Sequence, residues 1–129
     1  MTSPIQALKF LVVDDNKINQ LVIGNKLKSL NQTVIFADNG KEAVAKFAQE
    51  EFDVVLMDLM MPVMDGFEAT LRIKETAKGQ KTPIIAVTAD TLESDRKKCY
   101  EVGMTGYLNK PFELNKLQRL LVDLGYNIG

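Results

Sequence analysis

The sequence predicts an α/β fold, a doubly wound (βα)5 domain built on a five-stranded parallel sheet. Three observations lead to this prediction. Short apolar runs recur along the chain, segments with helical spacing lie between them, and the connections are short, without a low-complexity linker or an internal repeat. Such alternation is typical of parallel strands that are joined by right-handed crossovers through helices.

The strands are predicted from apolar runs that are continuous rather than alternating. Four runs stand out, at 10–13, 34–37, 54–57 and 84–87, and a weaker fifth lies at 106–108. Strands that are covered by helices on both faces have this character, because neither face meets water. We therefore expect all five strands in one buried parallel sheet.

Two later helices are predicted from capping residues and apolar spacing. Asn39, with Glu42 three residues after it, has the pattern of a capping box. The apolar residues of the helix that follows this cap are Ala43, Val44, Phe47 and Ala48. Near the end of the chain, leucines recur at positions 114, 117, 120, 121 and 124. This stripe predicts a terminal helix docked on the sheet.

The first helix, expected to begin near Lys17, carries more apolar residues than one core face can use. The residues predicted to face inward are Ile23, Leu27 and Leu30, with Val22 beside them. Ile18 and Leu21 fall on a different arc, about 100° or more from the centre of that stripe. They are either isolated surface residues, which are common, or a docking patch for a partner helix.

Composition bounds the class of protein. The chain has 129 residues, 46% of them apolar and 26% charged, so we expect a single domain over 1–129. Its net charge of −1 does not favour a nucleic-acid-binding surface. Its apolar runs are far shorter than the ~20 residues of a membrane helix, and no secretory signal is visible. We therefore expect a cytoplasmic location and no membrane contact by this chain.

Residue types that the sequence lacks bound its chemistry. There is no histidine, no tryptophan and one cysteine, Cys99. The lack of histidine removes the commonest general base and a common zinc ligand. Cys99 has no second cysteine to pair with and is expected to be a small buried hydrophobic residue. Any chemistry must use carboxylates, lysine and hydroxyls.

Polar residues follow the predicted strands at the points where they end. Asp14 and Asp15 follow the first run, Asp58 the third, Thr88 the fourth and Lys110 the fifth. Each alone has an ordinary explanation, such as a helix cap, a turn or a solvated charge. Because the carboxyl ends of parallel strands share one edge of the sheet, we expect these side chains to lie together there.

The three aspartates predict a cation site, because carboxylates packed together hold either a proton or a cation. With Lys110 they sum to a charge of −2, which a divalent ion would bring to zero. Oxygen ligands without histidine or cysteine favour Mg²⁺, or Mn²⁺, over zinc. Such a site can accept a phosphoryl group, whose oxygens would meet the metal, the ammonium and the threonine hydroxyl.

Other phosphate-handling motifs are missing or incomplete. The sequence has no Walker loop and no G-x-G-x-x-G after the first strand, so nucleotide binding through these motifs is not expected. A haloacid-dehalogenase-type phosphatase also uses an aspartyl nucleophile, but it places a second aspartate where this chain has Met60. Turnover of free phosphate esters is the enzymatic alternative.

Taken together, the motifs resemble the receiver domain of two-component response regulators, and they are most similar to the receivers of hybrid sensor histidine kinases. The segments that carry the resemblance are LVVDDN at 11–16, MDLMMPVMDG at 57–66, VTA at 87–89 and KP at 110–111. Further pieces lie at 16–19, 39–43, 66–70, 95–99 and 103–104, so the match covers essentially the whole chain. The resemblance implies a flavodoxin-like, receiver-type fold and a place in a phosphorelay.

The resemblance also implies which residues form the phosphorylation and metal site. Asp58 would be the phosphoacceptor. Asp15, Asp58 and the backbone carbonyl of Met60 would bind Mg²⁺, and Asp14 would assist through water.

A second group of residues would respond to the phosphoryl group. Lys110 would bind it, Thr88 would move to bond it, and Tyr107 would turn inward as Thr88 moves. The peptide bond between Lys110 and Pro111 is expected to be cis. Asp90, two residues after the threonine, stands at a position that the family uses to tune hydrolysis of the phosphate.

The resemblance implies partners as well. Because the chain has no histidine, the phosphohistidine would come from a sensor histidine kinase or a histidine phosphotransfer protein, with Ile18 and Leu21 docking the partner helix. A degenerate receiver that acts only as a protein-interaction module is the alternative. The sequence leaves open whether the chain stands alone or belongs to a hybrid kinase, and it does not predict an oligomeric state.

Overall fold

The computed structural model describes residues 4–89 and 92–129, and within them it contains five strands and six helices. The strands are β1 (Lys9–Val13), β2 (Thr33–Ala37), β3 (Val54–Met57), β4 (Ile84–Thr88) and β5 (Gly106–Asn109). The helices are α1 (Lys17–Lys28), α2 (Gly40–Gln49), α3 (Gly66–Lys74), α4 (Ala77–Lys81), α5 (Glu93–Glu101) and α6 (Leu114–Asp123). All five predicted strands are present.

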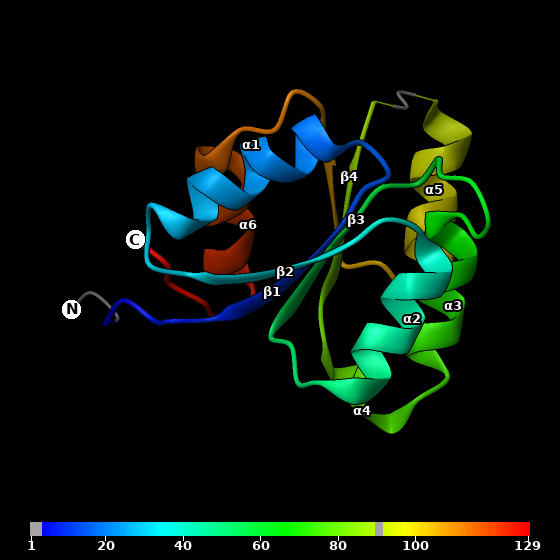
Figure 1. Ribbon diagram of the computed structural model, residues 1–129, viewed down its shortest axis with the longest axis horizontal. Helices are drawn as coiled ribbons and strands as arrows, with labels where there is room; N and C mark the ends of the chain where they lie inside the picture. Colours follow the sequence, from blue (N-terminus) through cyan, green and yellow to red (C-terminus); the bar gives the residue numbers. More distant parts are fainter. Residues whose placement is uncertain (1–3, 90–91) are drawn as a thin grey trace.

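The strands form one parallel sheet in the order β2-β1-β3-β4-β5. Helices α1 and α6 cover one face of this sheet, and α2, α3 and α5 cover the other (Figure 1). The order reverses between β1 and β3, and in flavodoxin-like sheets ligands bind outside the carboxyl ends of the strands at this switch point. The predicted doubly wound fold is confirmed.

Each face of the sheet has its own hydrophobic core, because successive residues of a strand point to opposite faces. The core under α2, α3 and α5 includes Leu11, Val13, Val55, Met57, Phe47 and, as predicted, the buried Cys99. The core under α1 and α6 includes Phe10, Val12, Leu56, Leu117 and Leu121. The continuous apolar runs of the sequence are therefore two interleaved faces, both buried.

Asparagine side chains cap the helices that lead away from the carboxyl ends of β1 and β2. The side chain of Asn16 accepts hydrogen bonds from the backbone N–H groups of Ile18 and Asn19, at 2.9 and 3.1 Å. That of Asn39 accepts the N–H of Glu42 at 2.8 Å. The predicted start of α1 and the predicted cap of α2 are confirmed.

Helix α4 was not predicted from the sequence. It is five residues long and begins at a cap in which Thr76 Oγ1 accepts the N–H of Gly79 at 2.9 Å. Gly79 is required there, because a Cβ atom would lie 1.8 Å from the carbonyl oxygen of Ile73. The expectation of five helices missed α4 because so short a helix has no apolar periodicity to detect.

The buried residues of α1 are Gln20, Ile23, Gly24 and Leu27, so the inward positions predicted for Ile23 and Leu27 are confirmed. The prediction for Val22 is wrong, because this residue is 42% exposed. Leu30 lies beyond the end of α1 and is only partly buried. Gly24 leaves room for Phe36, whose ring would lie 2.5 Å from a Cβ atom at that position.

The terminal helix α6 docks on the sheet as predicted. Leu117 and Leu121 are fully buried, Leu114 and Leu120 pack partly against the core, and Leu124, just past the end of the helix, is 37% exposed. None of the helices in the described part of the chain has the length and apolar character needed to cross a bilayer.

Candidate functional site

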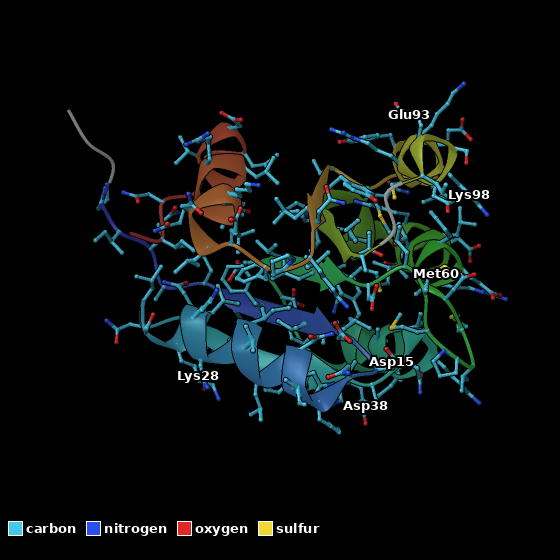
Figure 2. The ribbon with its side chains drawn as sticks, turned by 90° about the horizontal axis from the view of Figure 1, so that it is seen from above. Asp15, Lys28, Asp38, Met60, Glu93 and Lys98 are labelled. Atoms are coloured by element: carbon cyan, nitrogen blue, oxygen red, sulfur yellow. The ribbon has the colours of Figure 1, made fainter. Side chains whose placement is uncertain are left out.

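The carboxyl edge of the sheet brings together the side chains that the sequence predicted to meet there. Asp14 and Asp15 follow β1, Asp58 follows β3, Thr88 is the last residue of β4, and Lys110 follows β5. Figure 2 looks onto this edge, where Asp15, Asp38 and Met60 are labelled. Four strand ends thus contribute to one site.

Three carboxylates and one ammonium form the centre of this site. Carboxylate oxygens of Asp14, Asp15 and Asp58 all lie within 4.8 Å of one another. Lys110 Nζ lies 2.8 Å from Asp14 Oδ2 and 2.9 Å from Asp58 Oδ2. Asp14 and Asp58 are buried, at 1% and 5% exposure, whereas Asp15 is exposed. Lys110 therefore bridges two buried carboxylates that would otherwise repel each other.

Backbone amides hold the second oxygen of each buried carboxylate. The N–H of Asn16 donates to Asp14 Oδ1 at 2.9 Å, and the N–H of Leu59 donates to Asp58 Oδ1 at 2.8 Å. Each carboxylate is thus fixed by an amide on one oxygen and by Lys110 on the other. Their orientation is set before any ligand binds, which lowers the cost of binding one.

The protonation equilibria follow from burial and from these contacts. Burial raises the pKa of the Asp58 carboxyl above its ordinary value, and the hydrogen bond from Lys110 offsets only part of the rise. Burial lowers the pKa of Lys110, but the hydrogen bonds to Asp14 and Asp58 outweigh that effect, so its net pKa is raised. Lys110 therefore stays charged, and one ammonium faces three carboxyl groups.

The donor set fits a hard divalent cation. Its side-chain ligands are carboxylate oxygens alone, close enough to share one ion, and one of the three is open to solvent. Mg²⁺ and Mn²⁺ prefer such oxygens, whereas zinc prefers nitrogen and sulfur. Met60 follows on the loop after β3 and is 65% exposed. The ligand role expected for it concerns its backbone carbonyl, an oxygen donor like the three carboxylates.

The loop between β3 and α3 contains a strained residue that the sequence did not reveal. Val63 has φ 73°, in the left-handed region, which β-branched residues rarely adopt. The N–H of Met64 donates to the carbonyl of Pro62 at 2.9 Å, which closes a γ-turn around Val63. Val63 itself is 75% exposed. A glycine at this position would have signalled the turn, but valine gave no such signal.

Two glycines allow other parts of the backbone to pack closely against the same loop. A Cβ atom on Gly66 would lie 2.1 Å from the carbonyl oxygen of Asp58, and one on Gly40 would lie 2.5 Å from the carbonyl oxygen of Met64. Their backbone N–H groups donate to Leu59 and Met64, respectively. The loop is therefore tied to the residues that follow β3 and to the start of α2.

Gln20, on the buried face of α1, also contributes to the site, and the sequence did not predict this role. It is 4% exposed, and its Nε2 donates to the Asp14 carbonyl at 2.7 Å and to Asp38 Oδ1 at 2.8 Å. Lys17 pairs with the same Asp38 oxygen at 2.7 Å. The available signal was spacing, because Gln20 stands three and seven residues before Ile23 and Leu27, on the buried face of α1.

Thr88 and Tyr107 lie on neighbouring strands near the cluster. Thr88 is 1% exposed, and its carbonyl accepts the N–H of Lys110 at 2.8 Å. Tyr107 on β5 is half-buried, and the Arg96 guanidinium of α5 lies 5.4 Å from its ring centre, within cation–π range. The predicted cis peptide bond between Lys110 and Pro111 is present. Asp90 lies outside the described residues.

The outward face of α1 carries exposed apolar residues beside the site. Ile18 is 70% exposed and Leu21 is 59% exposed, as predicted, and Val22 extends the same surface. A hollow of about 150 Å³ between α1 and the loop after β5 adjoins this surface and is lined in part by Val22 and Phe112. We call Ile18, Leu21 and Val22 the α1 patch.

Comparisons with known proteins agree with this geometry. The family model of the response regulator receiver domain matches residues 10–122. The signal transduction histidine-protein kinase BarA of Escherichia coli K12 is 40% identical over 116 residues, which is 90% of this chain but only 13% of that protein. The chain thus spans a small part of this hybrid-kinase relative.

Two solved structures share the fold over nearly the whole chain. The receiver domain of sensor histidine kinase PA1611 from Pseudomonas aeruginosa, crystallised with a magnesium ion in its active site cleft, is 41% identical; the match has a TM-score of 0.84 and covers 92% of this chain and 97% of that one. The receiver domain of Saccharomyces cerevisiae Ssk1, crystallised with the histidine phosphotransfer protein Ypd1, is 29% identical; that match has a TM-score of 0.85 and covers 95% and 92%. The chain belongs to the response regulator receiver domain family.

Proposed function

We propose that the chain is a phosphoacceptor domain of a two-component phosphorelay and that Asp58 is its phosphorylated residue. The carrying observation is the cluster in which Lys110 bridges the buried Asp14 and Asp58 while the exposed Asp15 lies beside them. In the reaction, the P–N bond of a partner's phosphohistidine breaks, a P–O bond to a carboxylate oxygen of Asp58 forms, and the imidazole leaves. The chain supplies the acceptor, and the partner supplies the phosphoryl group.

Metal binding is part of this proposal. Asp14, Asp15, Asp58 and the backbone carbonyl of Met60 would hold Mg²⁺, with Mn²⁺ as a substitute. When bound, the ion supplies positive charge that offsets the charge developing on the transferred group. The binding of Mg²⁺ by the similar PA1611 receiver supports this assignment.

The chain's own residues would position the acceptor and respond to it. The N–H of Leu59 holds one oxygen of Asp58 in place during the attack. An aspartyl phosphate carries about one more negative charge than the carboxylate. Lys110 would transfer its hydrogen bond from the carboxylate to the new phosphoryl oxygens. Thr88 would move towards the same charge, and the Tyr107 ring would turn into the space that it leaves.

The intact cluster supports an active receiver rather than a degenerate one. Chemical phosphorylation tests this directly: acetyl phosphate with Mg²⁺ should add one phosphoryl group, seen by intact mass. Asp58→Asn should abolish the addition, whereas Asp123→Asn, a matched change on the exposed side of α6, should not. Modification of another residue, or no modification with the metal present, would contradict the assignment. Sustained turnover of a free phosphate ester would instead indicate a phosphatase.

We propose that the α1 patch docks the phosphohistidine-bearing helix of a histidine kinase or histidine phosphotransfer protein. The patch lies on the helix that begins two residues after Asp15, and exposed apolar residues that anchor an interface typically contribute more than ~1 kcal/mol each. The Ssk1 receiver bound to Ypd1 supports a partner of this class. A cytoplasmic location and membership of a longer hybrid kinase stay predictions.

The docking proposal predicts different effects on two reactions, phosphoryl transfer from the partner histidine and phosphorylation by acetyl phosphate. Ile18→Ala with Leu21→Ala should slow transfer from the partner histidine to Asp58 by about tenfold or more and leave phosphorylation by acetyl phosphate unchanged. Val122→Ala, an exposed apolar change on α6, is the matched control and should affect neither assay. Equal losses in both assays would show that the patch supports the fold rather than a partner.

A further inference from the structure

A hollow lies at the opposite end of the sheet from the acidic cluster. It has a volume of about 380 Å³ and sits where β4 and β5 begin. Its walls come from the end of α3, from α4, from the turn before β5 and from the segment after α6. The polar side chains that line it are Lys74, Gln80, Lys81, Thr82 and Thr105. None of the residues that line it is acidic.

The two lysines of this hollow have no carboxylate within ion-pair distance among the described residues. Among residues 4–89 and 92–129, neither Lys74 nor Lys81 forms an ion pair, whereas Lys9, Lys17, Lys46 and Lys110 each pair with a carboxylate. A cavity lined by two ammonium groups and no carboxylate attracts anions.

Lys74 is held in position rather than free in solvent. Its stem packs along Gly103, whose Cβ position would lie 3.2 Å from Lys74 Cγ, and its Nζ donates to the Thr82 carbonyl at 2.8 Å. An ammonium has three donor hydrogens, so this bond leaves two for a ligand. Burial lowers the pKa of Lys74, the cost of a charge removed from water without a counter-ion. A bound anion would offset that cost.

The rest of the hollow is suited to a larger ligand than a bare ion. Thr105, one of the lining residues, accepts the N–H of Ile84 on its Oγ1 at 3.3 Å. Pro83, Leu124 and the half-buried Tyr126 give the hollow an apolar side. Aromatic and aliphatic walls with a few polar groups are typical of small-molecule sites of this size.

We propose that this hollow binds a small phosphate monoester with a planar ring, such as a mononucleotide. Lys74 and Lys81 bind the phosphate, and the ring lies on the side of Pro83 and Tyr126. The proposal is independent of Asp58 phosphorylation, because no residue of the hollow belongs to the acidic cluster.

The test is a titration of the unphosphorylated chain with AMP, and separately with inorganic phosphate, in magnesium-free buffer, followed by amide NMR spectra. The expected result is saturable shifts of the amides of Gly103 and Thr105 and their neighbours, with AMP binding more tightly than phosphate. Equal affinities would refute the contribution of Pro83 and Tyr126. No saturable shift, or shifts centred on Asp58 and Lys110, would overturn the site.

Variants test the lysines. Lys81→Gln should weaken AMP binding by about tenfold, since a charge-assisted hydrogen bond is lost, and Lys74→Gln by at least as much. Lys81 is exposed, so its variant is expected to fold even if Lys74→Gln does not. Lys41→Gln, an exposed change on α2, is the matched control and should leave the affinity unchanged. Wild-type affinity in Lys81→Gln would refute the proposed role of that lysine.

Discussion

The two edges of the sheet differ in the sign of their local charge and in their backbone conformation. At the carboxyl edge, three carboxyl groups lie together, and Lys110 pairs with the two that are buried. At the amino edge, two lysines line a hollow without any carboxylate. Each edge carries a local excess of one charge, although the net charge of the chain is only −1.

The backbone conformation also differs between the two edges. The amino edge uses residues that tolerate positive φ, Asn31 at 61° and Gly103 at 105°, whereas the carboxyl edge places Val63 at 73°. The carboxyl edge is therefore the one where both like-charge burial and backbone strain work against stability. Strain and buried charge concentrate at functional sites in proteins, so the difference points to the carboxyl edge as the reactive one.

The largest expected effect concerns the close-approach glycine at each edge. Gly66→Ala places a Cβ atom 2.1 Å from the Asp58 carbonyl, and Gly79→Ala places one 1.8 Å from the Ile73 carbonyl. We expect each to lower the free energy of unfolding by about 3 kcal/mol, because backbone must move to relieve the overlap. Only Gly66→Ala should also weaken Mg²⁺ binding.

Urea unfolding and a Mg²⁺ titration of both variants measure these effects. Similar losses of stability with a loss of metal affinity in Gly66→Ala alone would separate the two edges. Unchanged metal affinity in a folded Gly66→Ala protein would contradict the view that this glycine positions Asp58.

The second prediction removes the ammonium that each edge depends on. Lys110→Met leaves buried carboxylates unpaired and should cost about 2 kcal/mol without metal, since removing one partner of a buried ion pair is destabilising. Millimolar Mg²⁺ should restore part of this loss. Lys74→Met leaves no carboxylate unpaired and should change stability by less than about 1 kcal/mol. Urea unfolding with and without Mg²⁺ tests both, and a Lys110→Met protein as stable as wild type without metal would refute the prediction.

The sequence was sufficient to predict the sheet and the cluster at its carboxyl edge. Continuous apolar runs mark strands buried on both faces, and the residues after such strands must meet at one edge, whatever the details of the loops. The proximity of Asp14, Asp58 and Lys110 could therefore be predicted from the sequence without knowledge of any contact.

The features that escaped prediction have in common that they depend on contacts rather than on pattern. Val22 was predicted to face the core because the rotation of a helix about its axis, inferred from sequence, is uncertain by about one residue. In the structure Phe36 packs against Gly24, and Val22 is exposed. The hollow at the amino edge is assembled from four segments, none of which carries a motif. Val63 adopts its conformation because Gly66 and Met64 fix the loop around it, not because valine prefers it.

The third prediction tests the strain at Val63. Val63→Gly should raise the free energy of unfolding by about 1 kcal/mol, because the left-handed cost for a β-branched residue exceeds the extra chain entropy lost by glycine. Asn31→Gly, the matched change at the amino edge, should alter stability by only a few tenths of a kcal/mol, since asparagine tolerates this conformation. A shift in the urea midpoint with an unchanged slope measures both. A destabilised Val63→Gly protein would mean that the valine side chain, despite its exposure, contributes to packing.

The smallest expected effect lies beside the acidic cluster, where Lys17 pairs with Asp38 at 2.7 Å. The hydrogen bond from Lys17, followed by that from Gln20, holds the pKa of Asp38 below its ordinary value. A carboxyl group with a lowered pKa in the folded state stabilises the fold at neutral pH, and this contribution disappears as the pH falls through the folded-state pKa. Both side chains are largely exposed, so the contribution is below about 1 kcal/mol and is screened by salt.

Lys17→Met should therefore lower stability slightly at neutral pH and low salt, and the difference from wild type should shrink in acid and in high salt. Lys41→Met, an exposed lysine on α2 without an ion pair among the described residues, is the control and should show neither dependence. Urea unfolding at neutral and acid pH, each at two salt concentrations, measures the four differences. A loss of stability that persists unchanged in acid would show that Lys17 acts through packing of its stem on α1 rather than through Asp38, and the electrostatic contrast between the edges would then rest on the buried cluster alone.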